Sequence, residues 1–460
     1  MSVYESPDSA RDIVARYQEK TRGSEAHLTQ AKKWLPGGDT RRVSFYPPHP
    51  LFLERGEGCY VHDCDGNKYI DMQNNYSSLI HGHAHPRIEA AAVAQLKKGT
   101  ALGSAAEIQY RHAEHLCRRI SALESVRYTN SGTEATMFAL RTARAYTGRH
   151  TILKMDGGYH GSHDFALVNQ FPDLEAPGGP RVWAEPWVPA GVKDHVLVVP
   201  FNDLEATENI LKNNKDQIAA ILMEPVLGAG GGVAPRPGYL RGMRELADRY
   251  GVLLIFDEVM TFRVHYGGAQ TEERVAPDLT ALGKIIGGGF PVGAFGGRKE
   301  IMELYNPAHP RSVFHSGTFC GNNITLAAGL MGLELYDPPA VARLNDLAAR
   351  LRNGFNRAFQ NAGLAGYVSG RGSLLSLHWR DDVPVNSKDA IFGILKAKEL
   401  PGLVHLEMIN QGVHAAPRGF FNLSTPMSER EVDLTIAAFE RTLAAVKPYV
   451  NEVLPHLIRG

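Results

Sequence analysis

The most constraining feature of this sequence is a run of apolar residues that ends in two carboxylates. Residues Val252 to Phe256 are all apolar, and Asp257 and Glu258 follow them directly. Such a run is typical of a strand buried on both faces, as in a parallel sheet covered by helices. Because ligands of these sheets bind beyond the carboxyl ends of the strands, we expect Asp257 to lie at a ligand site.

A carboxylate in that place is costly to bury unless a positive group lies beside it. A protonated pyridine nitrogen is one such group, and Lys284 is an amine that would hold the same cofactor at its other end as a Schiff base. Taken singly, however, an aspartate after a strand is more often a helix cap or an ion-pair partner, and a lone lysine is usually a surface charge. The hypothesis of a pyridoxal phosphate (PLP) site therefore needs support from the rest of the chain.

Composition excludes several classes of function. The 460 residues include 49 Lys and Arg and 49 Asp and Glu, so the formal net charge is zero, and no basic field would gather nucleic acid or an anionic membrane. The 4 cysteines form no CxxC pair, which suits a reducing compartment. We find neither the apolar core of a signal peptide nor the ~20 apolar residues that cross a bilayer. We expect a cytoplasmic protein with small-molecule ligands.

The order of expected elements divides the chain into three parts. Residues 1–85 should form an N-terminal arm of two helices and a small sheet; the arm has too few apolar residues for a core stripe and should pack on another subunit or fray. Residues 86–335 alternate helices with short apolar runs, which predicts a mainly parallel, doubly wound sheet. Residues 336–460 should form a smaller α/β domain. The strands expected in the large domain are 125–130, 151–155, 195–200, 219–224, 252–257 and 294–297.

Several motifs resemble ligand sites but lack the necessary surroundings. The histidines within 81–85, like His160 and His163, have no Cys, Asp or Glu in ligand spacing, and the Gly and Pro in the first group indicate a turn, so we expect no metal site. The glycine spacing of Gly228–Gly232 differs from that of a dinucleotide-binding loop, and the segment around Lys284 lacks the rest of a P-loop.

The segment Asn130–Ala135 predicts an anion site at the start of a helix. Ser131 is a good N-cap, and Glu134 follows at capping-box spacing. Gly132 lets a ligand approach the backbone, where the first N–H groups and the helix dipole favour a phosphate. Simple capping, worth about 1 kcal/mol, explains the same residues equally well at this point. Tyr159, framed by glycines after the next strand, is suited to lie against a heteroaromatic ring, although a surface loop is the simpler interpretation.

These motifs occur together and in the order of a known family. They are 130–135, 159–161, 224–226, 257–259, 284–293 and 317–322. With them the chain resembles the class III aminotransferases of fold-type I, over residues 30–445, and most of all the branch that contains glutamate-1-semialdehyde aminomutase and β-amino acid aminotransferases. The resemblance implies a fold-type I PLP transferase, with the doubly wound sheet in the large PLP-binding domain and a smaller α/β domain.

The resemblance also assigns roles to individual residues. Lys284 would form the Schiff base and act as the general base, and Asp257 would keep the pyridine nitrogen protonated. The cofactor-binding residues implied in this way are Ser131, Gly132, Thr133, Tyr159, Asp257, Val259, Lys284 and Thr318. Ser131 to Thr133 would hold the phosphate, and Tyr159 and Val259 would enclose the ring. Thr318 would reach the phosphate of a neighbouring subunit, which implies a homodimer with shared active sites. Glu224 receives no role.

Two arginines depart from the aminomutase pattern. Thr40–Arg42 stands where the aminomutase has Asn-Ser-Pro, and residues 414–421 include Arg418 but no acidic residue. Arginine pairs with carboxylates bidentately, so Arg41 and Arg418 resemble the substrate-binding arginines of β-amino acid aminotransferases, particularly those for β-phenylalanine-like substrates. A surface position is the alternative for both, and the favoured one for Arg42. Tyr76 and Phe45 would supply apolar walls.

We therefore expect a PLP-dependent transaminase that moves an amino group from an amino acid, of which a β-amino acid is the preferred candidate, to a 2-oxo acid such as 2-oxoglutarate. The alternative is an aminomutase of the glutamate-1-semialdehyde type or an amino acid racemase on the same cofactor. A non-catalytic PLP-fold binding protein is a different class, and the presence of both Lys284 and Asp257 speaks against it.

Overall fold

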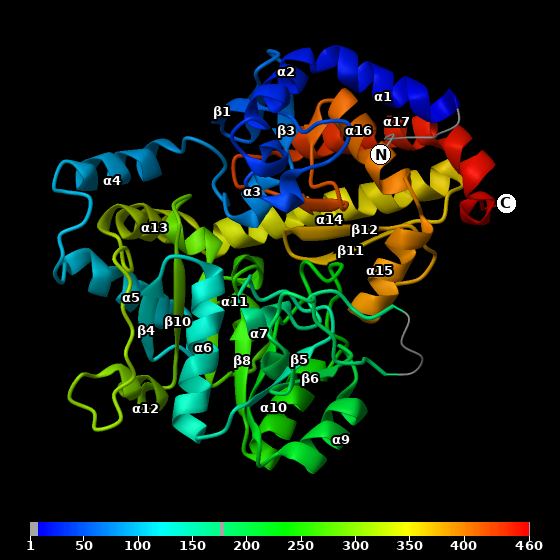
Figure 1. Ribbon diagram of the computed structural model, residues 1–460. Helices are drawn as coiled ribbons and strands as arrows, with labels where there is room; N and C mark the ends of the chain where they lie inside the picture. Colours follow the sequence, from blue (N-terminus) through cyan, green and yellow to red (C-terminus); the bar gives the residue numbers. More distant parts are fainter. Residues whose placement is uncertain (1–7, 175–178, 460) are drawn as a thin grey trace. The chain divides into compact units, whose positions relative to one another are not determined.

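The computed structural model describes residues 8–174 and 179–459, and its contacts divide the chain into two compact units (Figure 1). Unit 2 comprises residues 86–342 and 384–391. Unit 1 comprises the described parts of 1–85, 343–383 and 392–460, so the first and the third of the three expected segments belong to one unit. The first seven residues of the expected arm lie outside the described residues.

Unit 2 is built on a seven-stranded sheet with the order β4-β10-β9-β8-β7-β5-β6. The strands are β4 (Ser125–Thr129), β5 (Thr151–Met155), β6 (Val196–Val199), β7 (Ile218–Met223), β8 (Leu253–Asp257), β9 (Leu279–Gly283) and β10 (Gly293–Gly297). The four pairs from β9 to β6 are parallel, and only β10 runs antiparallel to its two neighbours. The expected mainly parallel, doubly wound fold is confirmed. β9 was missed, because its Thr and Gly interrupt the apolar run.

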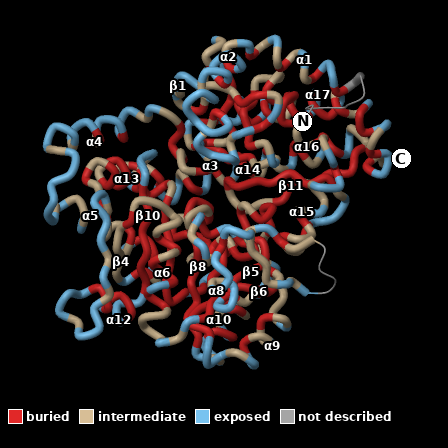
Figure 2. The backbone as a smooth tube through the Cα atoms, viewed as in Figure 1, coloured by how far each residue is buried: buried red, intermediate tan, exposed pale blue. Residues whose placement is uncertain are grey.

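Both faces of this sheet are buried under helices. Leu253 and Ile255 of β8 belong to a core cluster with Phe138 of α6 (Gly132–Thr147), whereas the alternate residues Leu254 and Phe256 belong to a second cluster. That second cluster includes apolar residues of α9 (Leu204–Asn214) and α10 (Tyr239–Tyr250). The alternation follows from the period of two in a strand. Figure 2 shows most strands of this unit in the buried colour, whereas β4 is mostly intermediate.

The other helices that begin in unit 2 are α4 (Pro86–Leu96), α5 (Glu107–Arg119), α7 (Asp164–Leu167), α8 (Ala190–Lys193), α11 (Gly268–Glu273), α12 (Lys299–Met302), α13 (Asn323–Leu335), α14 (Pro338–Ala362) and α15 (Ser387–Lys396). α14 and α15 both continue across a unit boundary into residues of unit 1.

Unit 1 combines two small sheets with helices. One sheet has the order β1-β2-β3-β13 and the other β11-β12-β14. The strands are β1 (Leu53–Glu57), β2 (Tyr60–Asp63), β3 (Lys68–Asp71), β11 (Tyr367–Arg371), β12 (Leu374–His378), β13 (Val413–His414) and β14 (Phe420–Asn422). The helices are α1 (Asp8–Lys20), α2 (Arg22–Ala31), α3 (Asn74–Ser77), α16 (Leu400–Asn410) and α17 (Glu429–Val453). β13 pairs in parallel with β3, although the paired residues Val413 and Ile70 lie 343 positions apart in the chain.

The expectation for the N-terminal arm is wrong. Ala10, Ile13 and Tyr17 of α1 are fully buried, and α1 packs on α16 and α17 within the same unit. The Tyr17 hydroxyl also donates a hydrogen bond of 2.7 Å to the carbonyl of His49. Residues at i, i+3 and i+7 share one helix face, so three apolar residues suffice for a narrow core stripe.

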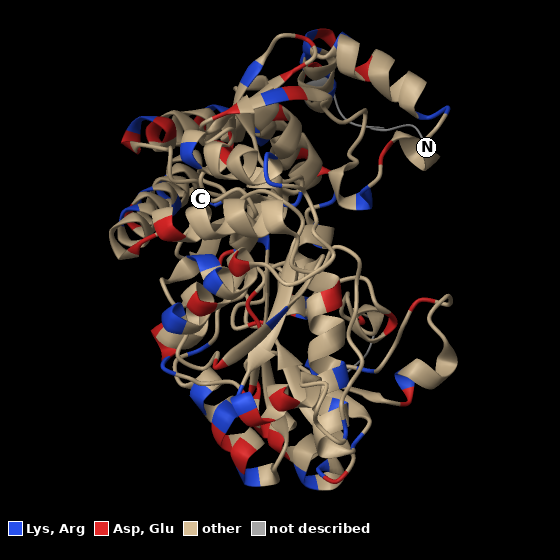
Figure 3. Ribbon diagram, turned by 90° about the vertical axis from the view of Figure 1, so that its left-hand side faces the viewer, with Lys and Arg blue, Asp and Glu red and all other residues tan. Residues whose placement is uncertain are grey.

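The structure agrees with the zero net charge of the sequence and with its short apolar runs. Figure 3 shows acidic and basic residues interspersed over the helices, without a face of one sign. Among the described residues, no helix has both the length and the apolar character that crossing a membrane requires. The four cysteines are free thiols.

Candidate active site

Strand order in unit 2 brings five chain segments to one edge of the sheet. Asp257 ends β8, Lys284 follows β9, and Glu224 follows β7 on the other side of β8. The loop after β5 comes next. β4 runs in the direction of β9, because β10 between them is antiparallel to both, so the start of α6 lies at the same edge. Carboxyl ends of parallel strands are where such sheets bind ligands.

Asp257 is buried and held by two partners. One carboxylate oxygen accepts a hydrogen bond of 3.0 Å from the N–H of Val259, and the other lies 2.8 Å from Nδ1 of His160. His160 is fully enclosed, and burial lowers its pKa, an effect that the negative charge of Asp257 opposes. The contact fixes the orientation of the carboxylate and leaves it able to accept a further hydrogen bond.

Lys284 begins a tight helical turn (Lys284–Gly287) and has a φ of 51°, in the left-handed region that side chains other than glycine rarely adopt. Backbone conformations of this kind are concentrated at functional sites. Burial lowers the pKa of Lys284 to about 8, while the negative charges of Asp257 and Glu224 oppose the shift. A substantial fraction of this amine is therefore neutral and nucleophilic near neutral pH, unlike that of an ordinary lysine.

Two further carboxylates lie in the same region. Glu224 accepts hydrogen bonds from the N–H groups of Tyr159, at 3.1 Å, and Gly228, at 3.0 Å. Burial and the charge of Asp257 raise the pKa of Glu224 to about 8, although both N–H groups favour its ionised form. Glu258 is fully buried and accepts three hydrogen bonds from residues 261–270, which accounts for it as a structural group.

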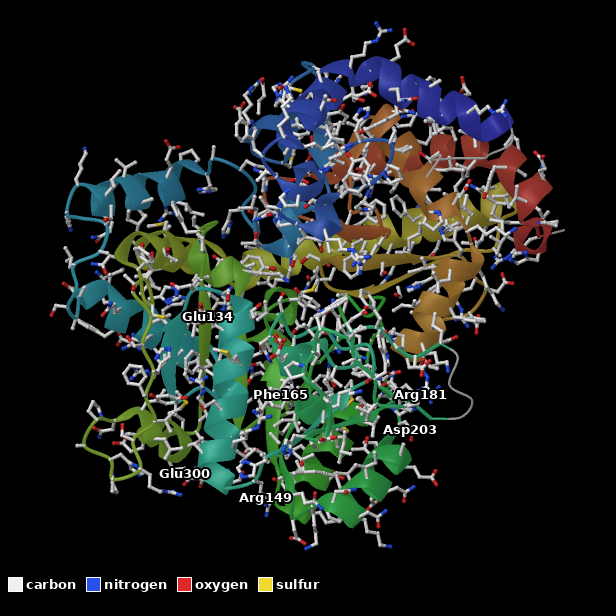
Figure 4. All side chains as sticks on the ribbon, viewed as in Figure 1. Glu134, Arg149, Phe165, Arg181, Asp203 and Glu300 are labelled. Atoms are coloured by element: carbon white, nitrogen blue, oxygen red, sulfur yellow. The ribbon has the colours of Figure 1, made fainter. Side chains whose placement is uncertain are left out.

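The start of α6 has the expected N-cap, Ser131, but Glu134 accepts from the residue before Ser131 rather than from the N–H of Ser131 that a capping box requires. The Ser131 hydroxyl accepts from the N–H of Glu134 at 3.1 Å, and the Glu134 carboxylate accepts from the N–H of Asn130 at 2.6 Å; Figure 4 labels Glu134 at this end of the helix. Among the described residues, the N–H groups of Gly132 and Thr133 have no protein acceptor. Capping therefore leaves two donors at the positive end of a helix dipole, as an anion requires.

Close contacts join these segments. A Cβ on Gly132 would lie 3.1 Å from both methyl carbons of Val259, and a Cβ on Gly161 would collide with Thr133. The loop that contains Tyr159 is thus packed against the start of α6. Tyr159 is 39% exposed, with its N–H fixed by Glu224. The structure brings together seven of the eight expected cofactor residues at one edge of the sheet. It does not join Thr318 to them, because Thr318 is exposed and no contact links it to Ser131–Thr133.

The two expected substrate arginines both belong to unit 1. Arg41 donates a hydrogen bond of 2.8 Å to the side chain of Asn75, and its guanidinium lies 5.5 Å from the centre of the Tyr76 ring. Burial raises the pKa of Tyr76, whereas the charges of Arg41 and Arg418 lower it, so both guanidinium groups lie near this phenol. Arg41, Arg42 and Arg418 are all exposed. Phe45 is also exposed.

The residues of unit 2 fit PLP. The group needs donors for a phosphate, an acidic partner for a ring nitrogen and an amine for its aldehyde. Gly132 and Thr133 offer unpaired N–H groups, Asp257 has a carboxylate with remaining acceptor capacity, and Lys284 has a pKa suited to Schiff-base formation. Within the described part of the chain, no three His, Cys, Asp or Glu side chains gather as metal ligands.

Two residues of this region were missed from the sequence. His160 was considered only as a metal ligand, although its place after β5 at the edge occupied by Asp257 was a usable signal. Lys154 points inward from β5, and its amine donates to the carbonyls of Gly158, Ala166 and Val168 at 3.1, 2.9 and 2.6 Å. Burial lowers the pKa of Lys154 to about 7. The signal for Lys154 in the sequence was a charged residue within an otherwise apolar strand.

Comparison with known proteins identifies the family. The family model for class-III aminotransferases matches residues 44–422. A glutamate-1-semialdehyde 2,1-aminomutase of Heliobacterium modesticaldum is 41% identical over 430 residues, 92% of this chain and 97% of that protein. An omega-transaminase from Sphaerobacter thermophilus has a TM-score of 0.90 at 39% identity, over 94% of this chain and 99% of the other. A β-phenylalanine aminotransferase from Variovorax paradoxus has a TM-score of 0.86 at 33% identity, over 96% and 98%. The chain belongs to the class-III aminotransferases, a family of PLP-dependent enzymes.

Proposed function

We propose that this enzyme is a transaminase that moves an amino group from a β-amino acid to a 2-oxo acid such as 2-oxoglutarate. The observation that carries the proposal is the guanidinium of Arg41 against the Tyr76 ring, with the charge of Arg418 also acting on the Tyr76 hydroxyl. Such a pair suits a substrate with a carboxylate and an apolar substituent. The names of the Sphaerobacter and Variovorax relatives support the same reaction class.

The residues of unit 2 would hold the cofactor. Lys284 would bind its aldehyde and Asp257 its ring nitrogen. The N–H groups of Gly132 and Thr133, with the hydroxyl of Ser131, would bind its phosphate, and Tyr159 and Val259 would enclose the ring. Bound PLP supplies an electron sink that stabilises negative charge on the substrate carbon that bears the amine.

Lys284 is the proton carrier of this scheme. Its neutral amine would lie beside the substrate carbon that bears nitrogen, where it would accept a proton and later give it back. A pKa near 8 suits this task, since the amine must both accept and release a proton near neutral pH. Its placement saves the entropy of a bimolecular encounter, worth about 7–11 kcal/mol in well-oriented cases. Asp257, held by His160, would keep the ring nitrogen of the bound cofactor protonated.

We further propose a cytoplasmic homodimer with shared active sites. Thr318 is exposed and is flanked by two exposed aromatic residues, Phe314 at 83% and Phe319 at 60% exposure. Exposed apolar groups that lie this close together mark an interaction surface. In the dimer, Thr318 of each chain would hydrogen-bond the phosphate bound by its partner. The four free thiols agree with a reducing compartment.

The second candidate is an intramolecular aminomutase. The 41% identity with the Heliobacterium enzyme favours it. Against it stand Arg41, in place of the aminomutase pattern at this position, and the segment 414–421, which lacks an acidic residue. An aminomutase needs no added oxo acid, whereas a transaminase cannot turn over without one.

A single assay separates the two. The holoenzyme is incubated with β-phenylalanine, and in parallel with glutamate-1-semialdehyde, each with and without 2-oxoglutarate. We expect amino transfer from β-phenylalanine that depends strictly on 2-oxoglutarate, with formation of glutamate. Isomerisation of glutamate-1-semialdehyde without an oxo acid, together with no transfer from β-phenylalanine, would favour the aminomutase and contradict the proposal.

A further inference from the structure

The inference concerns an unusual turn in unit 1. Asn74, Asn75, Tyr76 and Ser77 have φ values of 49°, 46°, 54° and 72°, so α3 is a turn of left-handed helix without a single glycine. Residues other than glycine normally enter this region one at a time. Four in succession persist only where the surroundings impose the conformation, and such segments are concentrated at functional sites.

This turn presents the partners of Arg41. The side chain of Asn75 accepts the hydrogen bond from Arg41, and the Tyr76 ring lies beside the same guanidinium. The Tyr76 hydroxyl donates a 2.6 Å hydrogen bond to the carbonyl of Val43, two residues after Arg41. In a right-handed turn, Asn75 and Tyr76 would point elsewhere, so the position of Arg41 depends on the left-handed one.

Asp71 holds the start of this turn. One oxygen of its carboxylate accepts the N–H groups of Gln73, at 2.9 Å, and Asn74, at 3.0 Å. The other oxygen lies 2.7 Å from Nε2 of His83, and Nδ1 of His414 lies 3.5 Å from the first. Burial alone would raise the pKa of Asp71, but the two imidazoles hold it well below its usual range. The carboxylate is therefore ionised, and neighbouring residues of unit 1 hold it in place.

The residue that follows Asp71 also pairs with the strand that leads to Arg418. The N–H of Met72 donates to the carbonyl of His414 at 2.7 Å, which pairs β3 with β13. Arg418 follows four residues after His414. His83 and His414 are thus explained as partners of the Asp71 carboxylate rather than as metal ligands.

We propose that Asp71 is a positioning residue: its carboxylate, set by His83 and His414, fixes the left-handed turn that holds Arg41 in place, and thereby determines how strongly the enzyme prefers substrates with a carboxylate. The inference rests on the proposed role of Arg41 and extends it to a network that touches neither substrate nor cofactor.

The test compares Asp71→Ala with a matched control, Asp63→Ala. Asp63 is equally buried in the same small sheet and accepts the N–H groups of Asp65, at 3.1 Å, and Asn67, at 2.8 Å, but has no contact with the turn. Both variants lose a buried carboxylate with two backbone donors, so a general loss of stability affects both. Asp71→Asn keeps an oxygen acceptor without the charge and serves if Asp71→Ala does not fold.

Two measurements are made on each holoenzyme. The first is amide hydrogen exchange over residues 73–79. The second is the ratio of kcat/KM for β-phenylalanine to that for 1-phenylethylamine, which has a methyl group where β-phenylalanine has its carboxymethyl group. We expect Asp71→Ala to speed exchange over residues 73–79 and to lower the ratio about tenfold, because a displacement of ~1 Å at a binding group costs up to ~100-fold. Asp63→Ala should change neither, and Asp71→Asn should lie between.

Equal behaviour of the Asp71 and Asp63 variants in both measurements would overturn the inference. Faster exchange with an unchanged ratio would overturn its link to substrate choice, since the turn would then be loosened without consequence. A wild-type enzyme with no preference for β-phenylalanine would instead count against the proposed function, and the exchange comparison would still decide whether Asp71 holds the turn.

Discussion

The groups around Lys284 in unit 2 and those around Arg41 in unit 1 differ in burial. Asp257, His160 and Glu224 are all buried. Asp257 contacts His160, and Glu224 accepts a hydrogen bond from the N–H of Tyr159, the residue before His160. Burial lowers the pKa of Lys284. Arg41 is exposed, and its guanidinium donates a hydrogen bond to Asn75 and lies against the ring of Tyr76. In the proposed function this difference corresponds to two tasks: the first group would carry out the chemistry common to the family, and the second would select the substrate.

Energetics support that separation. Removing one partner of a buried charged pair leaves an uncompensated charge and costs about 3–5 kcal/mol. A charge-assisted hydrogen bond at an exposed site is worth less, about 1.5–3 kcal/mol at most. Substitutions of the buried groups around Lys284 should therefore abolish the reaction for every substrate, whereas substitutions around Arg41 should change only which substrate is used. The predictions below run from the largest expected effect to the smallest.

Lys284→Ala should remove turnover. Without its amine the enzyme loses both the covalent attachment of the cofactor and the general base, and a general base alone contributes about 100- to 10,000-fold. We expect the visible absorbance of the lysine-bound cofactor to vanish as well. The control is Lys212→Ala, an exposed lysine of α9. If Lys284→Ala kept both the absorbance and turnover, the catalytic role assigned to the groups around Lys284 would be wrong.

Asp257→Asn should lower kcat for every amino donor by a similar factor. The amide cannot keep the ring nitrogen protonated, so the electron sink is weakened whatever the substrate. We expect a loss of about 100-fold or more, because a partner of a buried charge is lost. Steady-state rates with β-phenylalanine and 1-phenylethylamine provide the check. A loss confined to the donor with a carboxylate would show that Asp257 belongs to substrate selection instead.

Arg41→Ala, unlike Asp257→Asn, should affect mainly the amino donor that carries a carboxylate. We expect KM for β-phenylalanine to rise about 10- to 100-fold, as the loss of a charge-assisted hydrogen bond implies, with little change for 1-phenylethylamine. Arg42→Ala is the matched control, since this neighbouring arginine is also exposed. Equal effects of the two variants would indicate a general surface charge rather than a carboxylate contact.

The pH dependence of cofactor capture should reveal the shifted lysine. Lys284 must be neutral to attack the aldehyde, so capture of PLP by the cofactor-free enzyme should speed up as the pH rises and level off above a midpoint of about 8. Glu224→Gln should move this midpoint slightly to lower pH, because the negative charge that Glu224 acquires as it ionises, with its own pKa raised to about 8, favours the protonated amine. Stopped-flow absorbance over a pH series measures both. A midpoint near the ordinary lysine value of about 10.4 would contradict the burial argument.

The sequence predicted the parts of this structure that local pattern decides. β5 lies at 151–155, and the N-cap of α6 is the expected Ser131, because strand burial and capping are written in adjacent residues. The candidate cofactor residues could be placed for a similar reason. All of them except Thr318 lie at or just after the end of a strand or at the start of a helix, and in a doubly wound sheet such positions converge at one edge.

Long-range packing decided what the sequence could not predict. The contact of His160 with Asp257 joins residues 97 apart in the chain. The burial of α1 depends on α16 and α17, which lie at the other end of the sequence. The left-handed turn at 74–77 has no glycine to announce it, and it depends on Asp71 and on histidines that approach from two other segments. Adjacent asparagines were the only local signal.

Identification of the lysine that carries the cofactor tests the account most directly. The holoenzyme is reduced with borohydride, digested, and its peptides are sequenced by mass spectrometry. We predict one phosphopyridoxyl group, on Lys284 in the peptide that follows β9. Modification of Lys154 or of a surface lysine, or no modification in an active enzyme, would contradict the assignment of the chemistry to the edge where β8 and β9 end.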